Sequence, residues 1–130
     1  MHAFRKMVES GDLSGLEALL AEDVVFTSPV AFSPYRGRAI TAAIVRGASR
    51  VFEDFSYQRE FDETDGRGHA LVFDATVGGK RIQGCDFLHF DESGLIDGLT
   101  VMVRPLSAAN ALAEAMGAQF DRITQEATGN

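Results

Sequence analysis

The apolar positions near the N-terminus follow the period of an α-helix. Phe4, Met7 and Val8 fall on one face of a short helix. Asp12 can cap a second short helix, whose apolar stripe consists of Leu13, Leu16, Leu19 and Leu20. The start of the chain therefore predicts two helices that each bury one side.

A strand and a longer helix are predicted next. The run DVVFTS at 23–28 is rich in β-branched residues, which favour strands. Pro29 and Pro34 then favour an extended, turning connection. From Arg38 to about Phe52 the pattern is helical again, with apolar residues at Ile40, Ala43, Ile44, Ala48 and Val51.

In the second half the apolar pattern changes to a period of two, which is typical of strands. The segments that follow it are 55–61, 71–77, 81–90 and 99–104. Turn signals separate them at Asp65-Gly66, at Gly78-Gly79 and in the sequence DESG at 91–94. We therefore expect an antiparallel meander of about four strands.

The chain ends in a further predicted helix. Pro105 ends the last strand, and Ser107 can cap a helix whose apolar residues are Leu112, Ala115, Met116, Phe120 and Ile123. Helices, then hairpin-connected strands, then a helix indicate an α+β fold with a mainly antiparallel sheet. The 130 residues fit one domain, 1–130, whose last residues, 126–130, are expected to fray.

One carboxylate interrupts an apolar strand. Because side chains alternate along a strand, Asp86 shares its face with Leu88 and Phe90. An isolated ionised carboxylate costs several kcal/mol to bury, so Asp86 must be hydrogen-bonded, paired, neutral or in contact with a wet cavity. Either it is a structural acid or it lines an apolar ligand pocket, and the donors available to it include Tyr35, Tyr57, Arg59 and Arg81.

The same strand is apolar on its other face, which carries Cys85, Phe87 and His89. A strand that is apolar on both sides is expected to be covered on both sides. The chain's own helices would cover one face. A second copy of the chain is the simplest cover for the other, so we expect a homodimer formed through the outer face of the sheet.

Composition narrows the classes of function. The net charge is −7 and no basic patch offsets it, so a nucleic-acid partner is not expected. No apolar run reaches the roughly 18 residues that span a bilayer. Cys85 is the only cysteine and the start of the sequence does not resemble a signal peptide, so we expect a cytoplasmic protein. No metal or cofactor is expected, because His2, His69 and His89 lack the close spacing of metal ligands.

Two stretches resemble the nuclear transport factor 2-like superfamily. They are FRKMVESGDLSGLEALLAEDVVFTSPVAFSPYRGR and GCDFLHFDESGLIDGLTVMVRPLSAANAL, and the resemblance covers roughly residues 2–117. The chain looks most similar to the polyketide-cyclase-like and ketosteroid-isomerase-like branches. The resemblance implies a curved sheet wrapped around helices into a cone with a deep apolar pocket, and it implies dimerisation through the outer sheet face.

The resemblance also bears on catalysis. Asp86 falls on the position of the acid that donates a hydrogen bond to the substrate oxygen in ketosteroid isomerases. Ser28 stands where those enzymes have their base, and Phe4 where they have a tyrosine. Without the base no proton moves between carbons, so steroid isomerisation by that set of residues is not expected.

Related mechanisms on this fold need residues that are also absent or unplaced. Limonene epoxide hydrolases use an Asp-Arg-Asp set, but Gly84 replaces the arginine and the last strand supplies no second acid. Scytalone-dehydratase chemistry needs a pocket histidine, and His69 could point inward by strand parity. Polyketide cyclases of this fold use an acid, a part that Asp86 alone could play.

We therefore expect a pocket that holds a mid-sized, mainly apolar organic molecule. Asp86 would be its polar anchor and candidate general acid, and the wall would comprise Phe26, Ser28, Phe32, Tyr35, Leu71, Phe73, Leu88, Leu99, Val101 and Val103. Three alternatives remain open at this point: proton-transfer catalysis (isomerisation, cyclisation or dehydration), ligand binding without turnover, and a dimeric interaction module.

Overall fold

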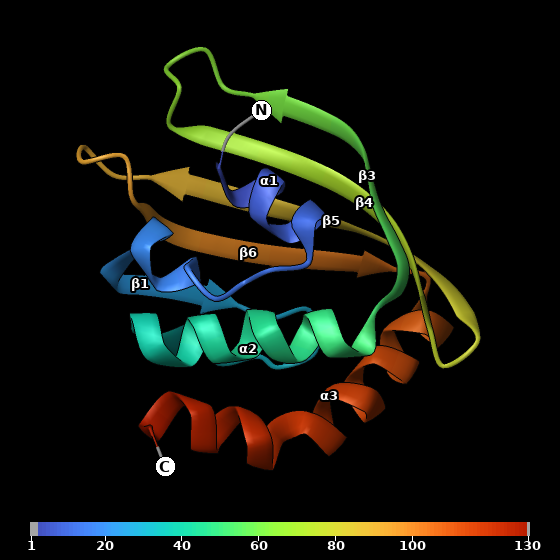
Figure 1. Cartoon of the computed structure of the whole chain (residues 1–130). Helices are drawn as coiled ribbons and strands as arrows, with labels where there is room; N and C mark the ends of the chain where they lie inside the picture. The colour runs from blue at the N-terminus through green and yellow to red at the C-terminus, as the bar shows by residue number, and fades with distance from the viewer. Residues whose placement is uncertain (1–2, 130) are drawn as a thin grey trace.

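The computed structural model describes residues 3–129 (Figure 1). In chain order the elements are α1 (Ala3–Ser10), the 3-10 turn η1 (Leu16–Leu19), β1 (Leu20–Thr27), β2 (Tyr35–Arg36), α2 (Arg38–Val51), β3 (Glu53–Asp62), β4 (Gly68–Val77), β5 (Lys80–Phe90), β6 (Ile96–Arg104) and α3 (Leu106–Thr128). The predicted α+β fold is confirmed, and so are the long central helix and the four-stranded meander.

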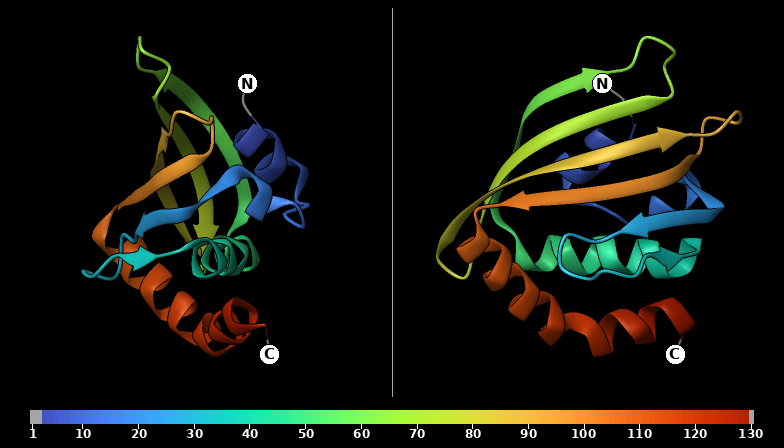
Figure 2. Two further views of the ribbon diagram at one scale, coloured as in Figure 1. Left: turned by 90° about the vertical axis from the view of Figure 1, so that its left-hand side faces the viewer. Right: turned by 180° about the vertical axis from the view of Figure 1, so that it is seen from behind.

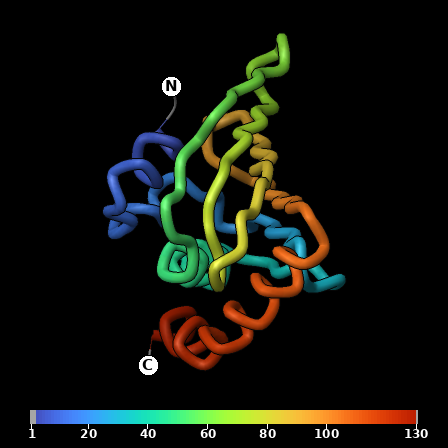
Figure 3. Tube along the Cα trace, turned by 90° about the vertical axis from the view of Figure 1, so that its right-hand side faces the viewer, coloured from blue at the N-terminus to red at the C-terminus, as the bar shows by residue number. Residues whose placement is uncertain are grey.

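The strands form a single sheet in the order β2-β1-β6-β5-β4-β3. All neighbours are antiparallel except β1 and β6, which pair in parallel. Figure 2 shows the strands curving around α1 and α2, and Figure 3 shows β3, β4 and β5 side by side as they descend towards the end of α2. The sheet is open, because β2 and β3 form its two edges.

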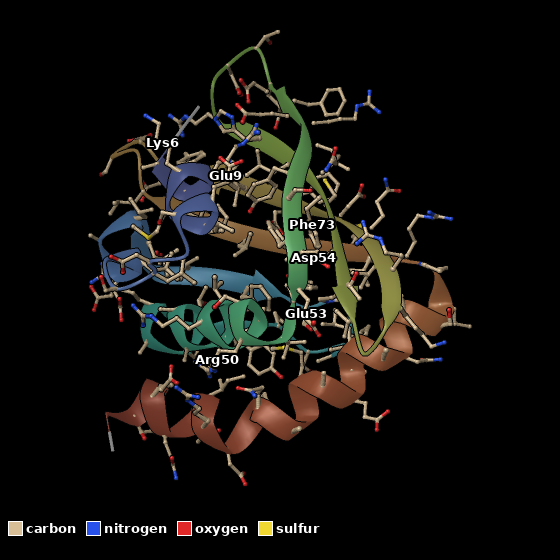
Figure 4. The ribbon with its side chains drawn as sticks, turned by 45° about the vertical axis from the view of Figure 1, so that its right-hand side comes forward. Lys6, Glu9, Arg50, Glu53, Asp54 and Phe73 are labelled. Atoms are coloured by element: carbon tan, nitrogen blue, oxygen red, sulfur yellow. The ribbon has the colours of Figure 1, made fainter. Side chains whose placement is uncertain are left out.

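The helices stand in a row inside and below this sheet. Figure 1 shows α1 and α3 on opposite sides of α2. The contact between α2 and α3 is close, because a Cβ built on Gly47 would lie 2.7 Å from Cδ1 of the fully buried Ile123. Arg50 strengthens it through an ion pair with Glu126 at 3.0 Å and a hydrogen bond to Gln119 at 2.8 Å. Figure 4 shows Arg50 on the side of α2 that faces α3.

Two of the predicted caps are wrong. Asp12 accepts a hydrogen bond from the backbone N–H of Ser14 and so closes a turn rather than capping an α-helix. The segment that follows makes only a 3-10 turn, because from Leu20 onwards the backbone joins β1 and pairs with β6. Ser107 lies inside α3, which begins at Leu106 after the extended Pro105 and has no side-chain cap.

The predicted fray of 126–130 overlaps with regular structure. The helix α3 continues to Thr128 and ends at Gly129, which has the left-handed conformation common after helices. Residue 130 lies outside the described residues, so the prediction of mobility itself stays a prediction. None of the described helices combines the length and apolar character needed to cross a membrane.

Candidate functional site

A cavity of about 410 Å³ lies between the concave face of the sheet and the helices. Its wall is mainly apolar, and the aromatic members are Phe4, Phe26, Tyr35, Phe52, Phe55, Tyr57, Phe73 and Phe120. They come from both helical and strand segments far apart in the sequence. A cavity of this size and character suits a small organic molecule with few polar groups.

Asp86 is the polar centre of this cavity. It lies on β5 opposite Leu71 of β4, faces inward and is 9% exposed. Tyr57 reaches it from β3, where its hydroxyl donates a hydrogen bond of 2.9 Å to Oδ2 of Asp86. Oδ1 receives no hydrogen bond from any residue that the structure describes. One carboxyl oxygen is thus held by the protein, and the other remains available to a ligand.

Burial controls the protonation of this pair. Loss of solvation raises the pKa of Asp86 to about 7, although the hydrogen bond from Tyr57 acts in the opposite direction. Burial also raises the pKa of Tyr57, and the neighbouring Asp86 carboxylate adds to that effect. Tyr57 therefore stays a neutral phenol that can donate, and Asp86 holds its proton over much of the acidic and neutral range.

The position of Phe73 depends on a glycine. Phe73 on β4 pairs with Gly84 on β5, and a Cβ at residue 84 would lie 2.2 Å from Cζ of the Phe73 ring. The ring therefore occupies the space where any other residue would have its side chain. It stacks on Phe55 at 4.8 Å between centroids and forms part of the cavity wall. Packing of the Phe73 ring thus explains why residue 84, two positions before Asp86, is a glycine.

A second polar group lies where α1 approaches β3. Nη1 of Arg5 donates a hydrogen bond of 3.0 Å to Glu60 on β3, and Nε lies 3.4 Å from Glu9 on α1. The Arg5 guanidinium also lies over the Tyr57 ring, 5.6 Å from its centroid. Glu9 lines the cavity, and Figure 4 shows it on the part of α1 that faces β3.

The structure places most of the predicted wall residues on the cavity. Asp86 is joined there by Phe26, Ser28, Tyr35, Phe73, Leu99 and Val101. The prediction for Phe32 is wrong: its side chain is 100% exposed, because the loop between Pro29 and Pro34 carries it outward. Leu71 and Leu88 are buried in the core but do not line the cavity, and neither does the half-buried Val103.

Sequence reasoning missed the helical part of the wall. Val45 and Ala48 of α2 line the cavity, and so does Phe52, which directly follows that helix. Met116 and Phe120 of α3 line it as well. Their helical periodicity identified apolar faces but could not separate a cavity wall from a closed core. Tyr57 was one of four candidate donors for Asp86, and only the pairing of β3, β4 and β5 selects it.

The remaining chemical candidates lie outside the cavity. Nδ1 of His69 contacts Asp62, and Nδ1 of His89 lies 2.6 Å from Asp97. Neither histidine lines the cavity. The strand register places His69 opposite Leu88, on the inner face as parity predicted, but its ring packs against Phe90. Cys85 points to the opposite face of the sheet, and burial raises the pKa of its thiol. No group of three potential metal ligands exists among residues 3–129, and His2 lies outside the described residues.

Comparison with known proteins shows the family of this chain. The family model of the SnoaL-like domain matches residues 1–98. The chain belongs to the SnoaL-like domain family. This family is part of the nuclear transport factor 2-like superfamily, so the resemblance inferred from the sequence is confirmed. No match was found among curated proteins.

Two crystal structures are similar over most of their length. A steroid delta-isomerase from Pseudomonas aeruginosa is 40% identical with a TM-score of 0.89, over 93% of this chain and 88% of that one. An uncharacterised bacterial protein with a cystatin-like fold from Silicibacter pomeroyi is 35% identical with a TM-score of 0.86, over 95% of this chain and 88% of that one.

A more distant structure shares the fold. A proposed polyketide cyclase from Pseudomonas putida is 21% identical with a TM-score of 0.67, over 82% of this chain and 89% of that one. The chain is thus related to the steroid delta-isomerase and shares its fold with the proposed polyketide cyclase.

Proposed function

We propose that this protein binds a mid-sized, mainly apolar molecule through one carbonyl oxygen and catalyses proton transfer on it, with Asp86 as the hydrogen-bond donor. The observation that carries the proposal is the half-satisfied carboxyl group in an apolar cavity. Tyr57 occupies Oδ2 of Asp86, and Oδ1 has no partner among the described residues. A protonated carboxyl group is a strong donor to a carbonyl oxygen in a site that excludes water.

The raised pKa supports this role. A neutral ketone can only accept a hydrogen bond, so it is complementary to the protonated acid and is repelled by the carboxylate. With the pKa of Asp86 at about 7, the donor form is present at and below neutral pH. The similarity to a steroid delta-isomerase supports carbonyl-directed chemistry, although Ser28 and Phe4 stand where the isomerase motif has its base and tyrosine.

A ketone titration tests the binding step. β-Tetralone, a neutral two-ring ketone, is titrated into the wild type and into Asp86→Asn by calorimetry between pH 5.5 and 8.5. In the wild type we expect a constant dissociation constant below pH 7 and about a tenfold rise per pH unit above it. The variant keeps a donor amide of similar shape that does not titrate, so its affinity should be independent of pH.

Two results would contradict the proposed anchor. One is a wild-type affinity that stays constant across the whole pH range. The other is the same loss of affinity above pH 7 in the asparagine variant. If neither protein binds β-tetralone or its phenol counterpart β-naphthol, the pocket does not recognise apolar carbonyl compounds. Binding without any conversion or proton exchange would instead favour the second candidate, a non-catalytic ligand-binding module.

We also propose that a second copy of the chain covers the outer face of the sheet. Phe61, Phe87 and Met102 are 50%, 42% and 59% exposed on that face. Phe61 and Phe87 flank Ala70 in one row across β3, β4 and β5. Sedimentation of the wild type should give a dimer, and Phe87→Lys should give a monomer with an unchanged fold. A monomeric wild type at high concentration would contradict this proposal.

A further inference from the structure

We infer that Glu9 is the proton acceptor of this site, which supplies the base that position 28 lacks. The inference rests on the proposed function and adds the residue that the proton transfer needs. Among the described residues that line the cavity, only Glu9 and Asp86 carry carboxyl groups, and no histidine, lysine or cysteine lines it. Any protein base that acts inside this cavity must come from that short set.

The two carboxyl groups lie in different surroundings. Asp86 is buried beneath Tyr57 and accepts a hydrogen bond from it, and no cation contacts it among the described residues. Glu9 is paired with the guanidinium of Arg5 at 3.4 Å and keeps 37% of its side chain exposed. Glu9 thus lies beside a cation and bulk water, whereas Asp86 lies in a mainly apolar wall. Two acids with divergent environments are the usual arrangement for a general acid and a general base.

Arg5 and Tyr57 connect the two carboxyl groups. Arg5, which holds Glu9, lies over the ring of Tyr57, and the hydroxyl of Tyr57 contacts Asp86. The Glu9 charge acts on Tyr57, whose pKa it raises further. Arg5 also donates a hydrogen bond of 3.0 Å to Glu60, whose side chain does not line the cavity. The base, the donor pair and the cation thus form one connected group at the α1–β3 side of the cavity.

The proton transfer balances without a further reagent. The Glu9 carboxylate takes a proton from the carbon beside the ligand's carbonyl, and the electrons of that C–H bond form a carbon–carbon double bond. The carbonyl π electrons move to oxygen, which is stabilised by the proton of Asp86. Glu9 can exchange its new proton with water, and return of a water-derived proton to the same carbon then gives exchange with solvent. Return of the proton to a conjugated carbon gives an isomer. No oxidation or reduction occurs.

Exchange of β-tetralone protons for deuterium, followed by NMR in heavy water near pH 6, tests the inference. We expect Glu9→Gln to slow the protein-catalysed exchange by at least about 100-fold, because a general base contributes on that order. The affinity for β-naphthol, which resembles the enol, should change by no more than about threefold. Glu9→Asp should recover part of the rate, because it restores a carboxylate.

Glu60→Gln is the matched control. It removes the other carboxylate partner of Arg5 but does not alter the cavity lining. Its exchange rate should stay within about threefold of the wild type. Equal losses in Glu9→Gln and Glu60→Gln would assign both residues to the support of Arg5 and overturn the inference.

Other outcomes separate the inference from the proposed function. A Glu9→Gln protein that exchanges at the wild-type rate overturns the role of Glu9. A wild type that binds β-tetralone without exchanging its protons also overturns it, but leaves the binding proposal standing. A wild type that binds neither β-tetralone nor β-naphthol overturns both.

Discussion

The Asp86→Asn substitution should remove a large pH dependence from the stability of the fold. In the folded protein the pKa of Asp86 is about 7, against an ordinary value of 3.8. Between these values the folded state binds a proton that the unfolded state has released. The free energy of unfolding therefore falls as pH rises through this window, and it levels off above about pH 7.

The size of the effect follows from the same two values. About three pH units separate 3.8 from about 7, and each unit is worth about 1.4 kcal/mol. The wild type should thus lose about 4 kcal/mol of stability between pH 4 and pH 8 through this one group. That loss is a large share of the roughly 5–15 kcal/mol that stabilises a typical domain.

The difference between wild type and variant isolates this contribution. Glu17 responds to pH in the opposite sense, because its hydrogen bond with Arg46 lowers its pKa. Such groups act equally in both proteins and cancel when the two unfolding free energies are subtracted. The two unfolding free energies are measured by urea denaturation at several pH values. Far-UV circular dichroism is the probe, because the chain has no tryptophan.

The expected result is a difference that favours the wild type at pH 4 and shifts by about 4 kcal/mol towards the variant by pH 8. Most of the shift should fall between pH 4.5 and 7. A difference that stays within about 0.5 kcal/mol across that range would contradict a raised pKa of Asp86 in the folded state. Asp86 would then be solvated or paired in the folded state.

Three further substitutions test the surroundings of the site. Gly84→Ala places a Cβ 2.2 Å from the Phe73 ring, so it should cost about 1–3 kcal/mol in urea denaturation and weaken β-tetralone binding; unchanged stability would contradict this packing. Tyr57→Phe removes the hydrogen bond that lowers the pKa of Asp86, so an NMR titration should find that pKa above about 7, and a lower midpoint would contradict the assigned bond. Ile123→Ala empties a fully buried position between α2 and α3, so it should cost about 2–5 kcal/mol, and a loss below about 0.5 kcal/mol would mean that α3 is not firmly docked.

Local sequence patterns predicted the helices and strands better than they predicted which strands pair with each other. Period-two alternation identified the meander, and hairpin signals at Gly78-Gly79 and Gly94 gave its antiparallel order. The parallel pairing of β1 with β6 was not predicted, because it joins segments about seventy residues apart and no turn links them. The short β2 was missed for a related reason, since two residues carry no periodicity.

In the candidate site, too, local features were predictable and contacts between distant segments were not. An acid within an apolar strand marked Asp86 as unusual, and parity gave its face correctly. The selection of Tyr57 depends on a register across three strands, which the sequence does not specify. Glu9 was not singled out at all, because it looks like any polar residue of a surface helix until α1 is packed against β3. Phe32 was wrongly predicted to line the cavity, because an apolar residue in a proline-bounded loop has no periodic signal to show its direction.

The most direct test of the account is the titration of the Asp86 carboxyl carbon by ¹³C NMR, without and with β-tetralone, assigned by comparison with Asp86→Asn. We expect a midpoint near 7 in the free protein. The midpoint should be higher in the complex, because a ketone binds only the protonated acid. A midpoint at or below about 4 that does not respond to the ketone would contradict both expectations. Asp86 would then be a structural carboxylate, and the cavity would have lost its donor.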